Sequence, residues 1–255
     1  MYEWIIYCED SLEGVFTAIY ETYEYKYNHE RTYIHAGEIS NYMLAEHSRY
    51  SQANPEKTRK VAQTVIREFG MDCYKLICRA LASYEEFKAD SVYHMIEYGL
   101  SLKNRRNLLN DLSNSYVLNV FKMKIEVCNE IHHMYGFLRF TEIDNGLLLS
   151  KIGPKNNIII FLAAHFEDRF PLENFAIYDE TRELFAVHPA GKQFIIVSGE
   201  KIDKEIFNHI SQDEEIYQEL FKTFWKCIAI QGRKNKKLQT QMLPLRFRDY
   251  MMEFR

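Results

Sequence analysis

The residues best suited to acid–base chemistry lie in one stretch of the second half of the chain, residues 165–171. His165 and Asp168 are three positions apart on a predicted helix, and a histidine beside a carboxylate is a common general acid–base pair. The same spacing is typical of an intrahelical polar pair whose neighbours Phe166 and Phe170 lie in the core, and this alternative stays open. His165 and Asp168 are therefore the candidate catalytic residues.

Other motifs that carry chemistry are absent from the sequence. It contains no GxxxxGK[ST], GxGxxG, HExxH or GxSxG pattern, and the adjacent His132 and His133 point about 100° apart on a helix. We therefore expect no metal and no cofactor. The cysteines are odd in number and show no CxxC spacing, which predicts reduced, buried thiols: Cys8, Cys73, Cys78, Cys128 and Cys227.

Charge is distributed unevenly along the 255 residues, although the net charge is only −4. The first thirty residues carry seven acids and one base, whereas residues 231–248 carry six bases and no acid. A basic end on a polarised chain predicts a phosphate-binding surface, with a solvated loop and helix face as the alternative. Neutralising six phosphates would give a slope of log K against log salt of about −5. The predicted phosphate contacts are Arg139, Arg169, Arg233, Lys236, Lys237, Arg246 and Arg248, with Asn235 and Gln239 on the same surface and Phe247 stacking on a base.

The composition indicates a globular chain with long helices, because 47% of residues are hydrophobic, 27% are charged, and there are only 10 glycines and 5 prolines. Residues 4–8 form a short apolar run typical of a buried strand. Asp10 and Glu13 then resemble a capping box that opens an amphipathic helix. Further helices are predicted from Asn54-Pro55 to Gly70, from a cap at Asp72 to Tyr84, and over residues 90–99 and 114–135.

The hydrophobic period changes after Gly136. Apolar runs over 137–143 and 147–152 flank Asp144-Asn145-Gly146, which predicts a hairpin. A helix is expected over 154–170, followed by strands over 175–178, 184–188 and 194–197 and a helix over 213–230. Asp179 and Arg182 span a predicted turn and favour a turn-stabilising pair. The fold class is α+β: a helix-rich N-terminal half that opens β-α, and a C-terminal antiparallel sheet of about five strands packed by helices.

Two placements of the domain boundary are open. The first divides the chain into residues 1–82 and 83–255, and the second places the seam near residue 136, where the period changes. The N-terminus lacks the basic region of a signal peptide, and the longest apolar run, residues 158–164, is far short of a membrane span. We expect a cytoplasmic protein without a membrane partner.

Several of these stretches together resemble one family, the proteins labelled "probable DNA metabolism protein". The resemblance covers nearly the whole chain and depends on the order and spacing of many short matches. The chain departs from the family pattern at two positions: Lys236 stands where the family has proline, and Arg248 stands where the family often has tryptophan. The matching positions include Tyr7, Asp10, Ser11, Gly14, Glu130, His132, 136–140, Ile152, Pro154, 164–166, 168–171, 177–179, Arg182, Arg233, Asn235, Gln239, Pro244, Arg246, Phe247, Glu253 and Phe254.

The resemblance implies a bacterial cytoplasmic protein associated with DNA repair or modification. Relatives are linked by fusion or gene neighbourhood to uracil-DNA-glycosylase-like domains and to a radical-SAM protein, and the family implies no particular reaction. Three hypotheses follow. The first is an accessory protein that binds DNA through its basic C-terminal surface and supports such a partner. The second is a glycosylase- or nuclease-like enzyme using His165 and Asp168, and the third is a protein-binding module whose acidic N-terminal face and basic tail dock partners.

Overall fold

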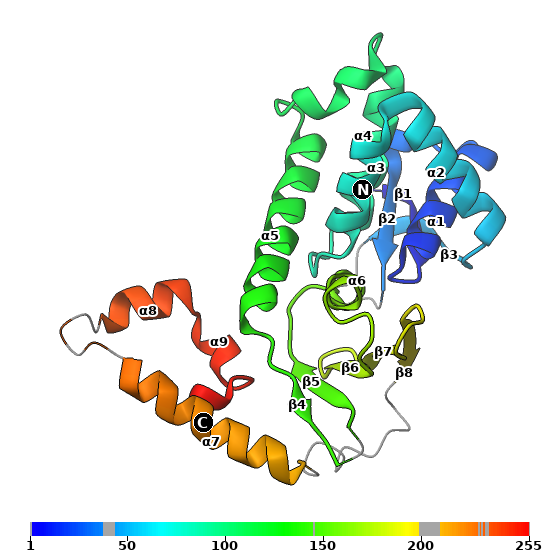
Figure 1. The fold of residues 1–255 in the computed structure, drawn as a ribbon. Helices are drawn as coiled ribbons and strands as arrows, with labels where there is room; N and C mark the ends of the chain where they lie inside the picture. The colour runs from blue at the N-terminus through cyan, green and yellow to red at the C-terminus, as the bar shows by residue number, and fades with distance from the viewer. Residues whose placement is uncertain are drawn as a thin grey trace. The chain divides into compact units, whose positions relative to one another are not determined.

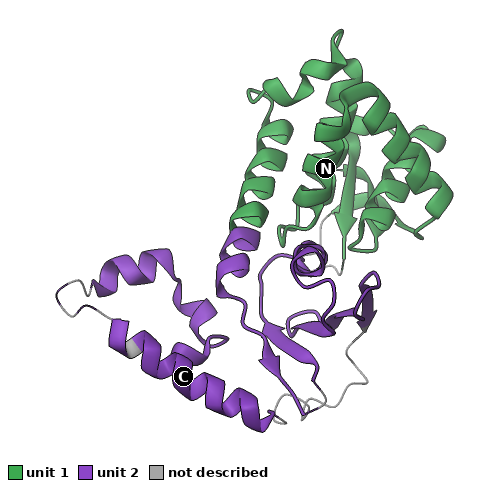
Figure 2. Ribbon diagram, viewed as in Figure 1, with its two compact units in different colours: residues 1–129 green, residues 130–255 purple. Residues whose placement is uncertain are grey.

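The computed structural model describes residues 2–37, 44–144, 146–198, 210–228, 230, 232 and 235–254. Its helices and strands form an α+β fold, as the sequence predicts (Figure 1). The chain divides into two compact units, Met1–Asn129 and Glu130–Arg255 (Figure 2).

A three-stranded parallel sheet forms the centre of unit 1. β1 (Tyr2–Cys8) lies between β2 (Thr32–Ala36) and β3 (Ala45–Ser51), with Ile6 opposite Ile34 on one side and Arg49 on the other. The apolar, β-branched stretch of β1 favours this central position, because a middle strand of a parallel sheet is covered on both faces. Helix α1 (Leu12–Glu24) connects β1 to β2 and buries Val15, Phe16 and Ile19.

The remaining helices of unit 1 begin and end at local signals. Asn54 caps α2 (Pro55–Phe69) by accepting from the amides of Glu56 and Lys57, and Gly70 ends it with a φ of 98° that favours glycine. The apolar faces of these helices pack into one hydrophobic core that includes Phe16, Ile34 and Tyr93. The other elements are α3 (Met71–Leu81), α4 (Lys88–Ser101), η2 (Arg105–Asn110) and α5 (Ser115–Phe137), which extends into unit 2.

Two expectations for the first 137 residues are corrected, and one strand was not expected. The N-cap of α1 is Ser11, whose hydroxyl accepts from Gly14, while Asp10 pairs with the ammonium of Lys88 at 2.6 Å. Helix α3 starts directly after Gly70 and has no side-chain cap, so Asp72 lies in its first turn. Strand β3 is not predicted by the sequence, because the segment AEHSRYS has no apolar pattern and its pairing with β1 defines it.

Unit 2 contains the five-stranded sheet in the order β4-β5-β6-β7-β8. The sheet is mixed rather than wholly antiparallel, because β5 and β6 run parallel and are joined by α6, as parallel neighbours require. β4 and β5 pair as the predicted hairpin, and Asn145 of its turn lies outside the described residues. The elements are β4 (Thr141–Glu142), β5 (Leu148–Ile152), α6 (Ile159–Arg169), β6 (Phe175–Asp179), β7 (Leu184–His188) and β8 (Ile195–Ser198).

The C-terminal part of unit 2 is helical (Figure 1). It consists of α7 (Gln212–Ile228), α8 (Lys236–Met242), α9 (Leu245–Arg248) and the 3-10 turn η5 (Met252–Phe254), which packs against α7. Among the described residues, no helix combines the length and the apolar character that crossing a bilayer needs.

Candidate nucleic-acid interface

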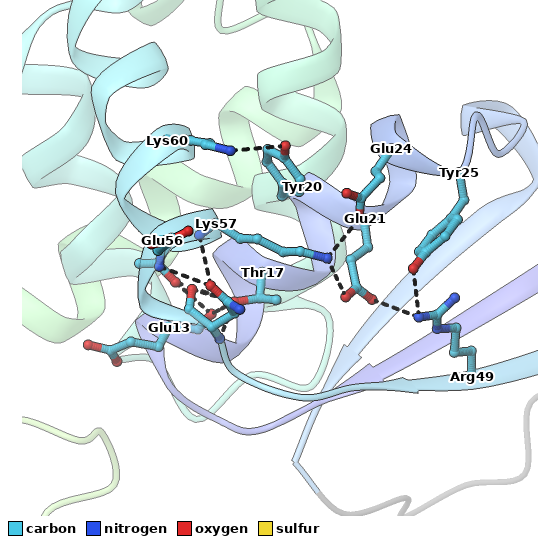
Figure 3. A network of polar contacts seen from close by, with 12 residues as sticks. Glu13, Thr17, Tyr20, Glu21, Glu24, Tyr25, Arg49, Glu56, Lys57 and Lys60 are labelled. Carbon is cyan, nitrogen blue, oxygen red and sulfur yellow. Dashed lines mark hydrogen bonds and ion pairs between the residues drawn. The ribbon is translucent and has the colours of Figure 1, made fainter.

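The acidic N-terminal segment is largely paired with bases inside unit 1. Glu21 of α1 lies between Lys57 and Arg49 (Figure 3), with Lys57 Nζ 3.0 Å from Oε1 and Arg49 Nη2 3.8 Å from Oε2. Lys57 also reaches Glu24 at 2.7 Å, and hydrogen bonds to these two carboxylates help raise the pKa of its ammonium group against the opposing effect of burial. These charges stabilise contacts between α1, α2 and β3, and docking of a partner on the acidic N-terminal face stays a prediction.

Glu130 is the centre of a second paired cluster, in unit 2. Its carboxylate is 2% exposed and accepts from the amides of Lys155 (3.0 Å) and Asn156 (2.8 Å) and from the side-chain amide of Asn156 (2.7 Å). Arg246 of α9 completes the cluster with Nη2 3.0 Å from Oε1. The Glu130 carboxylate therefore ties the loop before α6 and the start of α9 to α5. It also forms an ion pair with Arg246, so this guanidinium already has a partner.

Asp179 and Arg182 form the predicted turn-stabilising pair. Asp179 Oδ1 accepts from the amides of Thr181 and Arg182, and Arg182 Nη1 lies 3.2 Å from Oδ2. The guanidinium also donates to the carbonyls of Pro154 and Lys155. Burial raises the pKa of Asp179, and the opposite charge of Arg182 acts against this effect. The pair ties the end of β6 to the segment that follows β5.

Three of the predicted nucleic-acid contacts lie in paired or buried surroundings. Arg139 pairs with the nearly buried Glu253 at 2.9 Å and donates to two carbonyls. Arg246 is engaged by Glu130, so neither arginine offers a free charge. Phe247 is 2% exposed and packs against His133 and Phe137, which makes its ring a core contact rather than a platform for a base.

His165 and Asp168 lie on α6, but no hydrogen bond or ion pair joins them in the part of the chain that the structure describes. The His165 ring instead stacks on Tyr135, with ring centroids 3.9 Å apart. Asp168 and Arg169 are exposed at the end of the helix. The acid–base pair stays a prediction. Among the described residues, no three histidine, cysteine or acidic side chains are grouped closely enough to hold a metal ion.

Comparison with known protein families matches residues 86–253 to a domain of unknown function, DUF4130. The chain belongs to the DUF4130 family. No curated protein matches it. The DUF4130 match begins in unit 1 and includes the charged clusters of Glu130 and Asp179 in unit 2. The boundary between residues 82 and 83 stays a prediction.

The DUF4130 region also contains an open groove between α7, α8 and the C-terminus. Its volume is 810 Å³, and its described lining holds cations, amides and apolar side chains but no carboxylate. Asn235 accepts from the Leu238 amide and caps α8, which places Lys236 in the first turn of that helix. The polar and aromatic side chains that line this groove are Trp225, Asn235, Lys236, Gln239, Arg248 and Phe254.

Arg248 is the half-buried cation of this groove. Its guanidinium carbon lies 5.1 Å from the centre of the Phe254 ring, and Nη2 donates to the Leu243 carbonyl at 3.3 Å. Its Nε–H is buried and has no hydrogen-bond partner among the described residues. Because Arg248 lines the groove and is only half-buried, an acceptor that enters the groove could pair with its guanidinium.

The groove brings together only some of the predicted residues. Asn235, Lys236, Gln239 and Arg248 line it, and Lys237 is exposed beside them on α8. Arg169 is exposed on α6 and is not part of the lining, while Arg233 lies outside the described residues.

Two aromatic residues of the groove differ in what the sequence says of them. Trp225 is one of the aromatic residues near the basic segment that could stack on a base, although helical spacing favours a core position, and only the family resemblance singles out Phe254. Trp225 is 36% exposed, with its ring 5.7 Å from that of Phe254.

Proposed function

We propose that this DUF4130 protein is a DNA-associated accessory protein that binds single-stranded nucleic acid in the groove between α7 and α8. The observation that carries the proposal is Arg248, a half-buried guanidinium that lines a groove whose described lining has no carboxylate. A phosphate oxygen is the acceptor that suits a guanidinium best.

Aromatic side chains favour a single strand over a duplex as the ligand. Trp225 is partly exposed, and Phe254 forms the wall behind Arg248. A base that is free to leave its neighbours can stack on such a ring, with a contribution of about 1–3 kcal/mol per base. Lys236 and Lys237 are exposed and can neutralise the phosphates that follow along the strand.

The role in DNA repair or modification rests on the resemblance to the DNA-metabolism family. Its relatives are linked to radical-SAM and uracil-DNA-glycosylase-like proteins, so the accessory role is to hold a strand for a partner of one of these kinds. Co-purification of such a partner that resists nuclease treatment would mean that the two proteins contact each other directly.

The test is fluorescence anisotropy of labelled single- and double-stranded oligonucleotides across a salt series. With Lys236, Lys237 and Arg248 on three phosphates of a single strand, we expect a slope of log K against log salt of about −2. The variant Lys236→Glu/Lys237→Glu should reduce its magnitude by about 1.4. The matched control is Lys75→Glu/Lys103→Glu, which makes the same charge change at exposed positions of unit 1 and should leave the slope unchanged.

Trp225 provides an independent readout. In a Trp4→Phe background it is the only tryptophan, and stacking on a base should quench its fluorescence as the oligonucleotide binds. Binding that is weak and independent of salt, or a Trp225 signal that does not change on saturation, would contradict the proposed groove.

A further inference from the structure

A small pocket lies in unit 2 where the β4–β5 hairpin, α7 and the C-terminal segment meet. Its volume is 140 Å³, and its described lining contains three cations and no carboxylate. The hairpin contributes alternate residues of its strands, which point to the same face of a sheet. Helix α7 contributes two residues four positions apart, which lie on one side of the helix. The polar side chains of the lining are Arg139, Thr141, Lys151, Gln218, Lys222 and Tyr250.

The three cations of this pocket have two carboxylate partners between them. Arg139 pairs with Glu253 at 2.9 Å, and Lys151 Nζ lies 2.6 Å from Glu180. Lys222 is half-buried, and its ammonium group has no ion pair or hydrogen bond within the described part of the chain. The pocket therefore has one positive charge in excess. Because a half-buried cation loses part of its hydration, an anion that enters the pocket would stabilise Lys222.

Two further donors beside Lys222 indicate the class of anion. Thr141 is half-buried on β4, and its hydroxyl has no hydrogen bond to any described residue. Gln218 Nε2 donates to Glu214 at 2.8 Å, which leaves its second N–H for a ligand. An ammonium, a hydroxyl and an amide together suit the several oxygen atoms of an oxyanion. Pockets that enclose a drug-sized ligand measure about 300 Å³ or more, so 140 Å³ suits a phosphate group rather than a whole nucleotide.

We propose that this pocket binds a phosphate group, with Lys222 as its charged contact and with Thr141 and Gln218 as hydrogen-bond donors. The pocket shares no described lining residue with the groove of Arg248, so the site is separate from the proposed strand-binding groove.

The phosphate group has two possible sources, free phosphate and the end group of a larger molecule. The pocket adjoins an open groove of 610 Å³, with which it shares Arg139, Gln218 and Met252. That groove is lined by aromatic side chains from the start of unit 2 and from α7, so it suits the remaining atoms of a larger ligand. These side chains are Phe140, Tyr217, Phe221 and Phe224.

Isothermal titration calorimetry of the full chain with inorganic phosphate tests the site, in buffers whose ionic strength is kept constant with sodium chloride. We expect saturable binding, and Lys222→Gln should weaken it by about tenfold or more because the charged donor is lost. Thr141→Val keeps the charge and the shape of the pocket and should weaken binding by about threefold. The matched control is Lys192→Gln, which removes an exposed lysine of unit 2 between β7 and β8 and should leave the affinity unchanged.

The variant Lys236→Gln/Lys237→Gln separates this pocket from the groove of Arg248 and should bind phosphate as the wild type does. Phosphate binding that is lost in this variant and kept in Lys222→Gln would place the anion in the groove and overturn the proposal. A wild-type chain without saturable binding, or an equal loss in Lys192→Gln, would also overturn it.

Adenosine 5′-monophosphate distinguishes the two sources of the phosphate group. If it binds more tightly than inorganic phosphate and Lys222→Gln weakens both, the pocket holds the end group of a larger ligand. If it binds no more tightly and Lys222→Gln again weakens phosphate binding, the ligand is free phosphate. Adenosine monophosphate and phosphate that both bind Lys222→Gln as well as the wild type would reject the site.

Discussion

His133 shows how one side chain of unit 2 responds to its neighbours. Its ring packs between Phe137 and Phe247, with centroids 5.8 and 5.7 Å away. Burial is the first cause that lowers its pKa, and the positive charge of Arg246 adds to the effect. The folded chain therefore takes up a proton at this ring less readily than the unfolded chain does.

The expected consequence is a loss of stability in acid. In the unfolded chain the pKa of a histidine is about 6.5. The stability that neutral His133 contributes is therefore present above this pH and is lost as the pH falls below it. His133→Gln should show a flatter dependence of the free energy of unfolding between about pH 7 and 5 than the wild type. Urea unfolding followed by Trp225 fluorescence in a Trp4→Phe background measures it, with His47→Gln, an exposed histidine of unit 1, as the control. An unchanged slope for His133→Gln would show that this ring is not responsible.

Residue-level prediction is limited by distance along the sequence. Asp179 and Arg182 are three positions apart, and their pairing could be expected from the sequence. The partners of Arg139 and Arg246 are Glu253 and Glu130, more than a hundred positions away, and only the folded chain brings them together. Arg139 and Arg246, which look free in the sequence, are therefore already engaged, and the candidate site is reduced to the side chains around Arg248.

At the scale of elements, the contact between α1 and α2 depends on Lys57, which binds two carboxylates with different exposure. The Glu21 side chain is 9% exposed and that of Glu24 is 39% exposed. Removing the carboxylate of Glu21 takes a buried partner away from both Lys57 and Arg49. Removing Glu24 costs less, because water screens its more exposed pair with Lys57.

We expect Glu21→Ala to lower the free energy of unfolding by about 1–3 kcal/mol. Glu24→Ala, the control on the same helix and the same lysine, should lower it by less than about 0.5 kcal/mol. Chemical denaturation of the two variants measures both values. Equal losses would mean that burial of Glu21 does not strengthen the contact.

Elements with strong local signals could be predicted and those defined by pairing could not. The cap at Asn54 and the stop at Gly70 can be predicted from neighbouring residues, and the structure confirms both. The polar strand β3 and the parallel pairing of β5 with β6 depend on partners elsewhere in the chain. Helix α6 begins at Ile159 rather than near Pro154, because the amides before it are bound by Glu130.

At the scale of the whole molecule, each compact unit has its own core and its own tryptophan, Trp4 in unit 1 and Trp225 in unit 2. Chains with more than one compact unit commonly unfold in more than one step. Glu21→Ala should therefore shift the unfolding curve of Trp4, measured in a Trp225→Phe background, more than the curve of Trp225, measured in a Trp4→Phe background. Equal shifts of the two curves would show that the chain unfolds as one cooperative unit.

The position of Cys227 has a practical consequence. Burial raises the pKa of the Cys8 and Cys73 thiols to about 12, whereas Cys227 is the exposed thiol among the cysteines, on the helix that borders the groove. A thiol-reactive dye at neutral pH should consequently label this position ahead of the buried ones. The native sequence thus already contains an attachment point from which energy transfer to a labelled strand could be followed without engineering a new cysteine.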